Sequence, residues 1–338
     1  MRRKVIAAVL AGVLLLAAVG ALALWPTSSQ PLSAPRPVSI DAPSAISSNG
    51  ANVWVVNRDN NTLVRIDAAT GTVAATIAEN VFALPASNGV VVSPTDAYVS
   101  NANDTVDAYD QGSSHRKVSF TGGEDAGFSN PGAMALSGHH LYVVNTDDDK
   151  ILELDTTTGE VVATLMGPSS GFLNPDALCV TKGRLYVVSS ELNAVAMLST
   201  ATNAYLGPVD AAAGRFEDPR AVSCDAQHVW VANRQTSTVT EIDASNGAVV
   251  RVLSAGIDAP QAIASSPTRV FVADDGDDRV AMLAASTGAV LKVLGTARTF
   301  NQPAAMSLDA THLWVANTGG TSVVEIDATS GVILKHIS

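Results

Sequence analysis

Short apolar runs recur along most of this chain at nearly constant intervals. Each run centres on an aromatic residue, and these residues follow one another every 41 to 44 positions: Trp54, Tyr98, Tyr142, Tyr186, Trp230, Phe271 and Trp314. A proline precedes each aromatic position, and a large apolar residue stands three places before each proline, as in "FEDP" at 216–219. Because three independent positions keep one sevenfold register, the chain contains seven copies of one structural unit.

The copy that begins at residue 219 shows what one unit contains. "PRAVSC", "HVWVAN", "TVTEID" and "AVVRVL" are runs rich in β-branched residues, and the second is apolar on both faces whereas the third alternates. "DASNG" supplies turn residues between the third and fourth runs. Four short strands in ~43 residues are typical of a propeller blade. The sequence therefore predicts an all-β fold, a seven-bladed β-propeller of four-stranded antiparallel blades over residues 36–338.

The repeated core motif also resembles a known family. "WVVN", "YVSN", "YVVN" and "WVAN", followed by "EID" and a glycine, are similar to the YVTN-type β-propeller repeat, which is related in type to NHL and lyase- or lactonase-like propellers. The resemblance covers about residues 36–338. It implies the fold and leaves the function open, because such propellers include binding scaffolds, sensor domains and a few enzymes. How the ring closes is also open, since no blade obviously shares strands from both chain ends; residues 36–40 could add to the last blade.

The N-terminal segment predicts export. Three cations precede an uncharged apolar run from Val5 to Trp25. A signal-peptide core is usually ~7–15 residues and a membrane span needs about 20, so the length favours a hydrophobic helix that acts as an uncleaved signal anchor, with a cleaved signal peptide as the alternative. We expect residues 1–25 to form this segment, residues 26–35 to be a flexible linker, and the propeller to lie outside the cytoplasm, membrane-anchored or secreted.

The charge balance bears on the class of partner. The chain carries 20 Lys and Arg against 32 Asp and Glu, a net charge of −12. Such a surface repels nucleic-acid phosphates, and no basic patch interrupts it. Nucleic-acid binding is therefore not expected.

The residue after each proline should open the innermost strand of its blade, at the mouth of the central channel. At four of these positions the residue is small, but Asp176, Arg220 and Gln261 are polar and lie on consecutive blades. These three residues are the candidate binding patch. The simpler alternative is an Asp176–Arg220 ion pair that fills the mouth.

Two acidic loops are candidate metal sites, because Ca²⁺ prefers carboxylate and carbonyl oxygens. They contain Asp147, Asp148 and Asp149 in the third blade, and Asp274, Asp275 and Asp277 in the sixth. Neither loop has the spacing of a known calcium loop, and solvated acidic turns are the alternative. The expectation is no cofactor, with Ca²⁺ or another divalent cation as the exception.

The two cysteines, Cys179 and Cys224, fall in the innermost strands of neighbouring blades. One follows its proline by an even and the other by an odd number of residues, so their side chains point to opposite faces of their own sheets. Two side chains that face each other across a blade boundary need this arrangement, but it equally allows them to point apart. An exported chain with two cysteines is compatible with a disulfide, and two buried thiols are the alternative.

No catalytic constellation stands out. His140, His228 and His312 occupy equivalent places in alternate blades, so they cannot converge on one metal, and no Ser-His-Asp order is marked. The leading hypothesis is a non-enzymatic scaffold or sensor at the cell envelope that binds a protein, peptide or glycan on its loop face. The alternatives are a divalent-metal-dependent lactonase or lyase of the propeller type, and a solely structural envelope protein.

Overall fold

The computed structural model describes residues 40–77, 89–122, 127–254, 256–295 and 299–338. The predicted N-terminal helix, the linker and the first residues of the predicted propeller lie outside these ranges. Within them, no helix is long and apolar enough to cross a bilayer.

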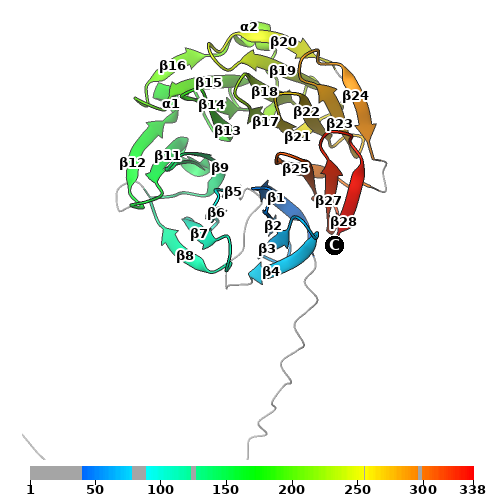
Figure 1. Ribbon diagram of the computed structural model, residues 1–338. Helices are drawn as coiled ribbons and strands as arrows, with labels where there is room; N and C mark the ends of the chain where they lie inside the picture. Colours follow the sequence, from blue (N-terminus) through cyan, green and yellow to red (C-terminus); the bar gives the residue numbers. More distant parts are fainter. Residues whose placement is uncertain (1–39, 78–88, 123–126, 255, 296–298) are drawn as a thin grey trace, which may run out of the picture. The chain divides into compact units, whose positions relative to one another are not determined.

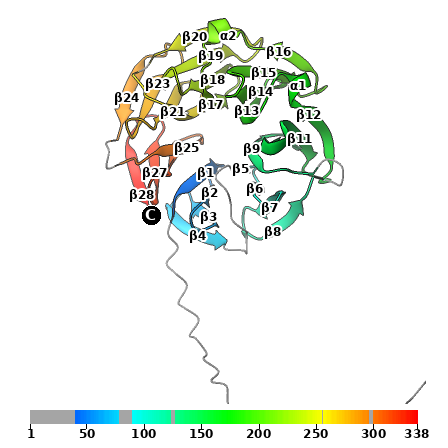
Figure 2. The ribbon, with the colours of Figure 1, turned by 180° about the vertical axis from the view of Figure 1, so that it is seen from behind.

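The described residues form seven four-stranded antiparallel sheets arranged as blades around a central axis (Figures 1 and 2). Blades 1 to 4 comprise β1 (Pro43–Ser48), β2 (Asn52–Asn57), β3 (Thr62–Asp67), β4 (Thr72–Ile77); β5 (Val90–Val92), β6 (Asp96–Asn101), β7 (Thr105–Asp110), β8 (Arg116–Phe120); β9 (Pro131–Ser137), β10 (His140–Asn145), β11 (Lys150–Asp155), β12 (Val161–Met166); β13 (Pro175–Thr181), β14 (Arg184–Ser189), β15 (Ala194–Ser199) and β16 (Tyr205–Pro208). Blades 5 to 7 comprise β17 (Pro219–Cys224), β18 (His228–Asn233), β19 (Thr238–Asp243), β20 (Val249–Leu253); β21 (Pro260–Ser265), β22 (Arg269–Asp274), β23 (Arg279–Ala284), β24 (Val290–Leu294); β25 (Pro303–Leu308), β26 (His312–Asn317), β27 (Ser322–Asp327) and β28 (Ile333–Ile337). The predicted fold class is confirmed for this part of the chain.

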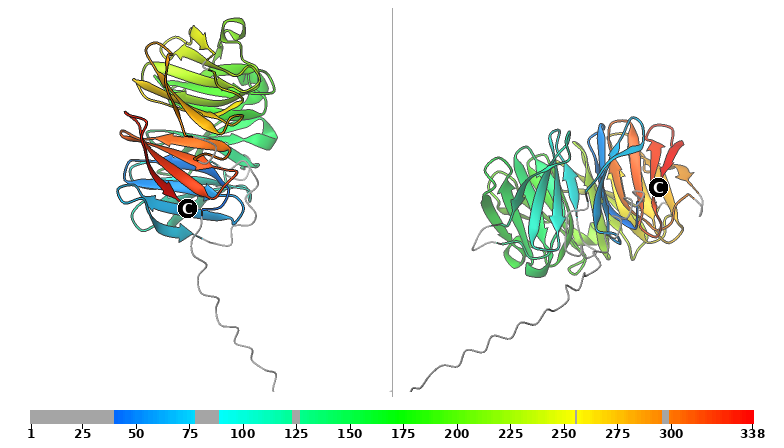
Figure 3. Two further views of the ribbon diagram at one scale, coloured as in Figure 1. Left: turned by 90° about the vertical axis from the view of Figure 1, so that its right-hand side faces the viewer. Right: turned by 90° about the horizontal axis from the view of Figure 1, so that it is seen from below.

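Three short helical turns lie in the loops: η1 (Thr146–Asp148), α1 (Gly167–Ser170) and α2 (Ala211–Gly214). All three belong to the loops on one face of the ring, which join the second strand to the third within a blade or connect successive blades. Viewed edge-on, the blades stand side by side with these loops along one rim and the other turns along the opposite rim (Figure 3). The face that carries the three helical turns is called the loop face below.

The hydrophobic core lies between blades rather than within them. The second strand of each blade has side chains buried on both of its faces, because each face of the sheet is covered by a neighbouring blade. Trp230 and Ala232 of blade 5, for example, pack with Ile263 and Val272 of blade 6, and all four are at most 7% exposed.

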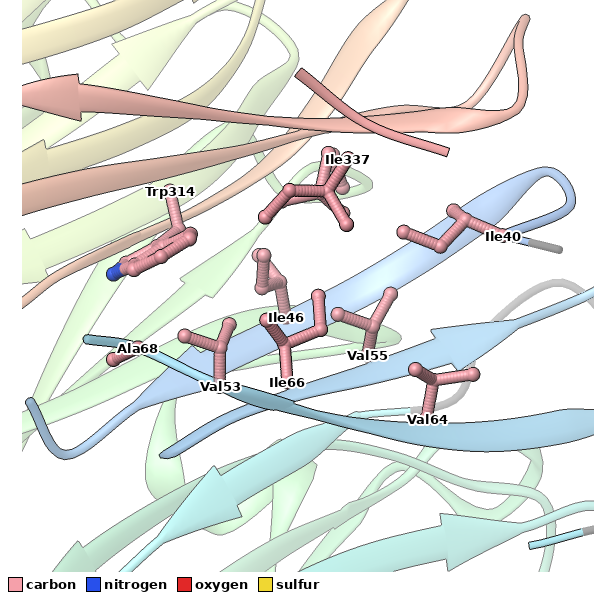
Figure 4. Close-up of a cluster of buried hydrophobic side chains, with 11 residues drawn as sticks. Ile40, Ile46, Val53, Val55, Val64, Ile66, Ala68, Trp314 and Ile337 are labelled. Atoms are coloured by element: carbon pink, nitrogen blue, oxygen red, sulfur yellow. The ribbon is translucent and has the colours of Figure 1, made fainter. Parts of the chain in front are cut away.

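The ring closes by packing between blades 7 and 1, and each of these blades keeps its own four strands. Trp314 and Ile337 of the last blade share one buried cluster with Ile46 and Ile66 of the first (Figure 4). Ile40 joins this cluster without belonging to a strand. Side-chain packing therefore performs the closure that the sequence left open.

Neighbouring innermost strands are joined by a contact that repeats around the channel. Ser223 of blade 5 and Ser265 of blade 6 share a 2.9 Å hydrogen bond between their hydroxyls, and the Ser48 N–H of blade 1 donates to the Ser307 Oγ of blade 7 over 2.9 Å. These positions are equivalent, since Ser223 pairs with the aromatic Trp230 as Ser307 pairs with Trp314.

The two cysteines occupy the same place between blades 4 and 5. Cys179 pairs with the aromatic Tyr186, and the structure joins it to Cys224 as a disulfide with Cα atoms 6.1 Å apart. The disulfide is thus a covalent version of the serine contact at two other blade boundaries.

Candidate functional site

The residues that follow the prolines meet at one end of the central channel, on the loop face. They line a cavity of about 420 Å³, to which all six described members of this set contribute: Ser44, Gly132, Asp176, Arg220, Gln261 and Ala304. The seventh member, Ala86, lies outside the described residues. The predicted patch Asp176, Arg220 and Gln261 is therefore one side of this cavity, which is called the mouth below.

A β-bulge directs these side chains into the channel. Pro175 pairs with Ser189 and Ala177 pairs with Val188, so Asp176 is an extra residue in its strand. The same register shift accompanies Arg220 and Gln261 in their strands. A bulge bends the strand and re-aims one side chain. The bulge explains why the position after the proline faces the mouth in successive blades.

The residue before each proline holds the loop in a left-handed conformation. All six described positions have φ between 42° and 50°: Ala42, Asn130, Asn174, Asp218, Ala259 and Gln302. Four of the six carbonyls accept hydrogen bonds from the second hairpin of the blade, as Asp218 O does from Arg234 N over 3.0 Å. A left-handed residue other than glycine costs about 1 kcal/mol, so the mouth carries backbone strain that the surrounding hydrogen bonds maintain.

The charged part of the mouth is a network of four residues, in which Arg234 Nη1 lies 3.6 Å from Asp218 Oδ2. Arg220 Nη1 lies 3.2 Å from Asp176 Oδ1, and Arg220 Nε lies 2.7 Å from Asp218 Oδ1. Asp176 Oδ2 also accepts a 2.8 Å hydrogen bond from the Ser190 N–H. The ion pair expected as the simpler alternative is present, and the Arg220 side chain remains 40% exposed. Sequence reasoning missed Asp218; its place before the proline, where Asp tolerates positive φ, is the signal that could have found it.

The rest of the mouth is small and mostly apolar. Ala177, Ala221 and Ala262 line the cavity together with the charged network, and the Gln261 side chain is partly exposed beside them. An apolar floor with a few polar groups on one side is the usual composition of a ligand site. The arrangement can therefore take an apolar group into the channel and hydrogen-bond a polar backbone or side chain at the rim.

A second cavity of about 370 Å³ occupies the other end of the channel. It shares Val222, Ile263 and Met306 with the mouth, so the two are ends of one channel. The Cys179–Cys224 disulfide lines this second cavity. The disulfide thus lies away from the loop face.

The first acidic loop is occupied by contacts within the protein. Asp147 Oδ1 accepts from Asn130 Nδ2 over 3.1 Å, and Asp148 Oδ2 lies 3.3 Å from Lys150 Nζ. Asp149 Oδ1 accepts from the Asn174 N–H. The three carboxylates thus hold neighbouring loops rather than one common point.

In the second acidic loop, Arg279 forms ion pairs with two of the carboxylates. Its Nε lies 2.7 Å from Asp274 Oδ2 and its Nη2 lies 2.6 Å from Asp277 Oδ2. Burial and the nearby charges of Asp278 and Asp274 raise the pKa of Asp275, against the opposing effect of Arg234. Across the described ranges, no group of three or more His, Cys, Asp or Glu side chains is placed to hold a metal ion.

The three histidines at equivalent positions lie at the opposite end of the second strands. His140 Nδ1 is 2.7 Å from the buried Glu153, and His312 Nε2 is 3.6 Å from the buried Glu325. Each pair stays within its own blade, so these side chains support separate sheets.

The comparisons with known proteins agree with this fold. A search of the curated proteins gave no match. Among solved structures, the chain is similar to the hydrazine synthase of Kuenenia stuttgartiensis, with a TM-score of 0.68 at 16% identity over 89% of this chain and 99% of that one. It is also similar to a streptogramin B lyase, with a TM-score of 0.66 at 14% identity over 83% and 92% of the two chains. The computationally designed Ika8 protein has a TM-score of 0.62 at 16% identity over 88% and 87%. At these identities the likeness shows the fold alone.

The comparison with protein families covers more than half of the chain. Residues 17–253 match the family named for the outer membrane protein assembly factor BamB. This range spans the first five blades, including Asp176 and Arg220 of the mouth. The YVTN type of the repeat stays a prediction. The chain belongs to the family of the outer membrane protein assembly factor BamB.

Proposed function

We propose that this protein is a non-enzymatic scaffold at the cell envelope, whose propeller binds a polypeptide segment of an envelope partner at the mouth of its channel. The observation that carries the proposal is the 420 Å³ cavity on the loop face, with its alanine floor and the Asp176, Arg220 and Gln261 side chains at one rim. The family name, an assembly factor of outer membrane proteins, supports a protein partner in this compartment. The uncharged run from Val5 to Trp25 supports delivery outside the cytoplasm, with the membrane as the anchor.

The mouth suits a polypeptide better than a reactive small molecule. Its polar groups can hydrogen-bond a main chain, and its small floor residues leave room for one apolar side chain. At the described positions before the prolines, backbone hydrogen bonds such as Arg234 N to Asp218 O hold the chain, which lowers the entropy cost of ordering it on binding. These features favour recognition of a polypeptide. The charged groups at the rim, Asp176 and Arg220, already form an ion pair with each other.

The test places a photo-crosslinking amino acid at Gln261 of the full chain in its native envelope. We expect an adduct with a second envelope polypeptide. The same amino acid at Arg269, at the start of β22 on the opposite face, is the matched control and should give none. Equal adducts at both positions, or none at Gln261, would overturn the proposal.

Substitutions then assign the contacts. Arg220→Ala and Gln261→Ala should weaken capture of the crosslinked partner while the fold is retained, because a half-exposed ion pair contributes only ~0–1 kcal/mol to stability. Asp176→Asn keeps an acceptor for the Ser190 N–H and removes the negative charge, so it tests the contribution of that charge to capture. Arg269→Ala is the control. A melting temperature that rises by several degrees with one divalent cation would instead favour the lactonase or lyase alternative.

A further inference from the structure

The outer turn of blade 2, between β7 and β8, differs from the same turn in the other blades. The residue of this turn whose backbone is in the left-handed region is Ser114, with φ 61°. At this position the other six blades have glycine or asparagine: Gly71, Gly159, Asn203, Gly247, Gly288 and Gly331. Serine there costs about 1 kcal/mol, and such strain persists where the surroundings or a function require the residue.

A long basic side chain covers the outer turn of the next blade at three boundaries, and the boundary between blades 1 and 2 is one of the four where this position has another residue. Arg251 and Lys292, each in the outermost strand of its blade, donate to carbonyls of the next blade's outer turn, as Lys292 Nζ does to Gly331 O over 2.7 Å. Lys335 reaches Ala69 O in the same way across the closure of the ring. The equivalent residue in blade 1 is Ala75, which pairs with Arg65 as Lys335 pairs with Glu325.

A groove of about 590 Å³ lies beside Ala75, between β4 and the outer turn of blade 2. Blades 1 and 2 lie side by side in Figure 1, with β4 and β8 as their outermost strands. The lining of the groove includes Ala75, Thr76, Ser114, His115 and Arg116. Its volume is in the range of small-molecule sites.

Two hydroxyls at this groove have no partner among the described residues. Ser114 is only 7% exposed, and within the described ranges neither its Oγ nor the buried Thr76 Oγ1 makes a hydrogen bond. A buried polar group without a partner costs free energy, so a hydroxyl that rotated about χ1 to meet a ligand in the groove would recover part of that cost.

The charge of the lining has the opposite sign to the charge of the chain. His115 and Arg116 face the groove, and none of the described residues that line it is acidic, although the chain as a whole carries −12. Arg116 Nη1 lies 3.4 Å from Asp107 Oδ2, and its side chain remains 44% exposed. A guanidinium with this exposure can still hold an oxyanion.

We propose that the groove between β4 and the outer turn of blade 2 binds a small anionic molecule, whose carboxylate or phosphate group contacts Arg116, His115 and the hydroxyls of Thr76 and Ser114. The site is on the outer side of the blades, apart from the mouth. A failure of this proposal would therefore leave the proposed function unaffected, and a failure of the proposed function would leave this proposal unaffected.

The probes are inorganic phosphate and citrate, with glycerol as a neutral control, titrated into the full chain by calorimetry. We expect one of the two anions to bind and glycerol not to bind. Arg116→Gln should weaken binding about tenfold or more, as loss of a charge-assisted contact does. Lys117→Gln is the matched control, because Lys117 pairs with Asp96 and does not line the groove.

Two further variants keep the fold intact and test the groove itself. Ala75→Lys places the side chain of blades 6 and 7 in the groove and should abolish binding. Ser114→Gly restores the residue of the other blades; it should raise the melting temperature and weaken binding. Binding of phosphate alone identifies a phosphate-bearing ligand, and binding of citrate alone a carboxylate. No binding of either anion, or binding that is unchanged in Arg116→Gln and Ala75→Lys, would overturn the proposal.

Discussion

Asp309 offers the sharpest test of how the ring closes. Its Oδ1 accepts from the N–H groups of Thr311 and His312 and so caps the turn between β25 and β26. Its Oδ2 accepts from Ser48 Oγ of the first blade over 2.9 Å and from Trp314 Nε1 over 3.0 Å. One carboxylate thus joins the turn, the buried core and the closing blade boundary.

Asp309→Ser should remove only the second set of contacts. Serine already caps the same turn in blade 6, where Ser266 Oγ accepts from Thr268 N and Arg269 N. A hydrogen bond to a charged group contributes about 1.5–3 kcal/mol, but water can replace the partner of the half-exposed Ser48. The buried Trp314 N–H has no such substitute. We therefore expect a loss of about 2–4 kcal/mol in the free energy of unfolding.

Asp225→Ser is the matched control. Asp225 Oδ1 caps the equivalent turn of blade 5 through Gln227 N and His228 N, but its Oδ2 contacts only His228 Nδ1, at 3.3 Å. It makes no contact across a blade boundary with its carboxylate among the contacts of the described residues. This variant should lose less than about 1 kcal/mol.

Urea unfolding and thermal melting of both variants give the measurement. Unfolding entropy of about 2.1 cal/mol/K per residue over ~300 residues converts 2–4 kcal/mol into a melting temperature lower by about 3–6 °C. Ser48→Ala combined with Asp309→Ser should cost less than the sum of the single changes, because the two residues share one hydrogen bond. Equal losses in Asp309→Ser and Asp225→Ser would refute the assignment of Asp309 to ring closure.

Three further predictions follow from the same contacts. Reduction of the Cys179–Cys224 disulfide, which closes a loop of 45 residues, should lower stability by about 4 kcal/mol, measured by urea unfolding with and without reductant; an unchanged midpoint would contradict a structural disulfide. Burial raises the pKa of the Asp309 carboxyl, but the hydrogen bonds that the carboxylate accepts outweigh burial and hold this pKa below 3.8. The stability that the Asp309 carboxylate contributes is therefore complete above pH 3.8 and is lost as the pH falls through the lower pKa of the folded state. The difference in stability between wild type and Asp309→Ser should accordingly become smaller in acid. Trp314→Phe should cost about 1–3 kcal/mol more than Trp230→Phe, because the buried Trp230 Nε1 has no hydrogen-bond partner among the described residues and so none to lose.

The sequence was sufficient to predict the strands and their order. Period-2 alternation, turn residues and the sevenfold register are local properties, and each blade repeats them. The same alternation placed Asp176, Arg220 and Gln261 at one end of the channel, where the structure also has them. What the alternation could not show was the bulge after each proline, since an extra residue in a strand leaves no periodic signal.

Some contacts between blades could be proposed from the sequence, as for Asp176 with Arg220, but most could not. Glycine at the outer turn predicts a positive φ, but whether a lysine of the preceding blade covers that turn depends on how two sheets face each other. Lys335 and Ala75 occupy equivalent positions, yet only Lys335 reaches the turn of the next blade. The open groove at blade 2 follows from this pairing of two distant segments.

The repeat period and the alternation within it determined the seven-bladed fold, because every blade encodes its own strands and turns. Only the tertiary structure decided how the ring closes, that Asp218 joins the charges at the mouth, and where a groove remains. These features depend on side chains from neighbouring blades, and Ser48 and Asp309 meet across the closure although they are 261 residues apart in the chain.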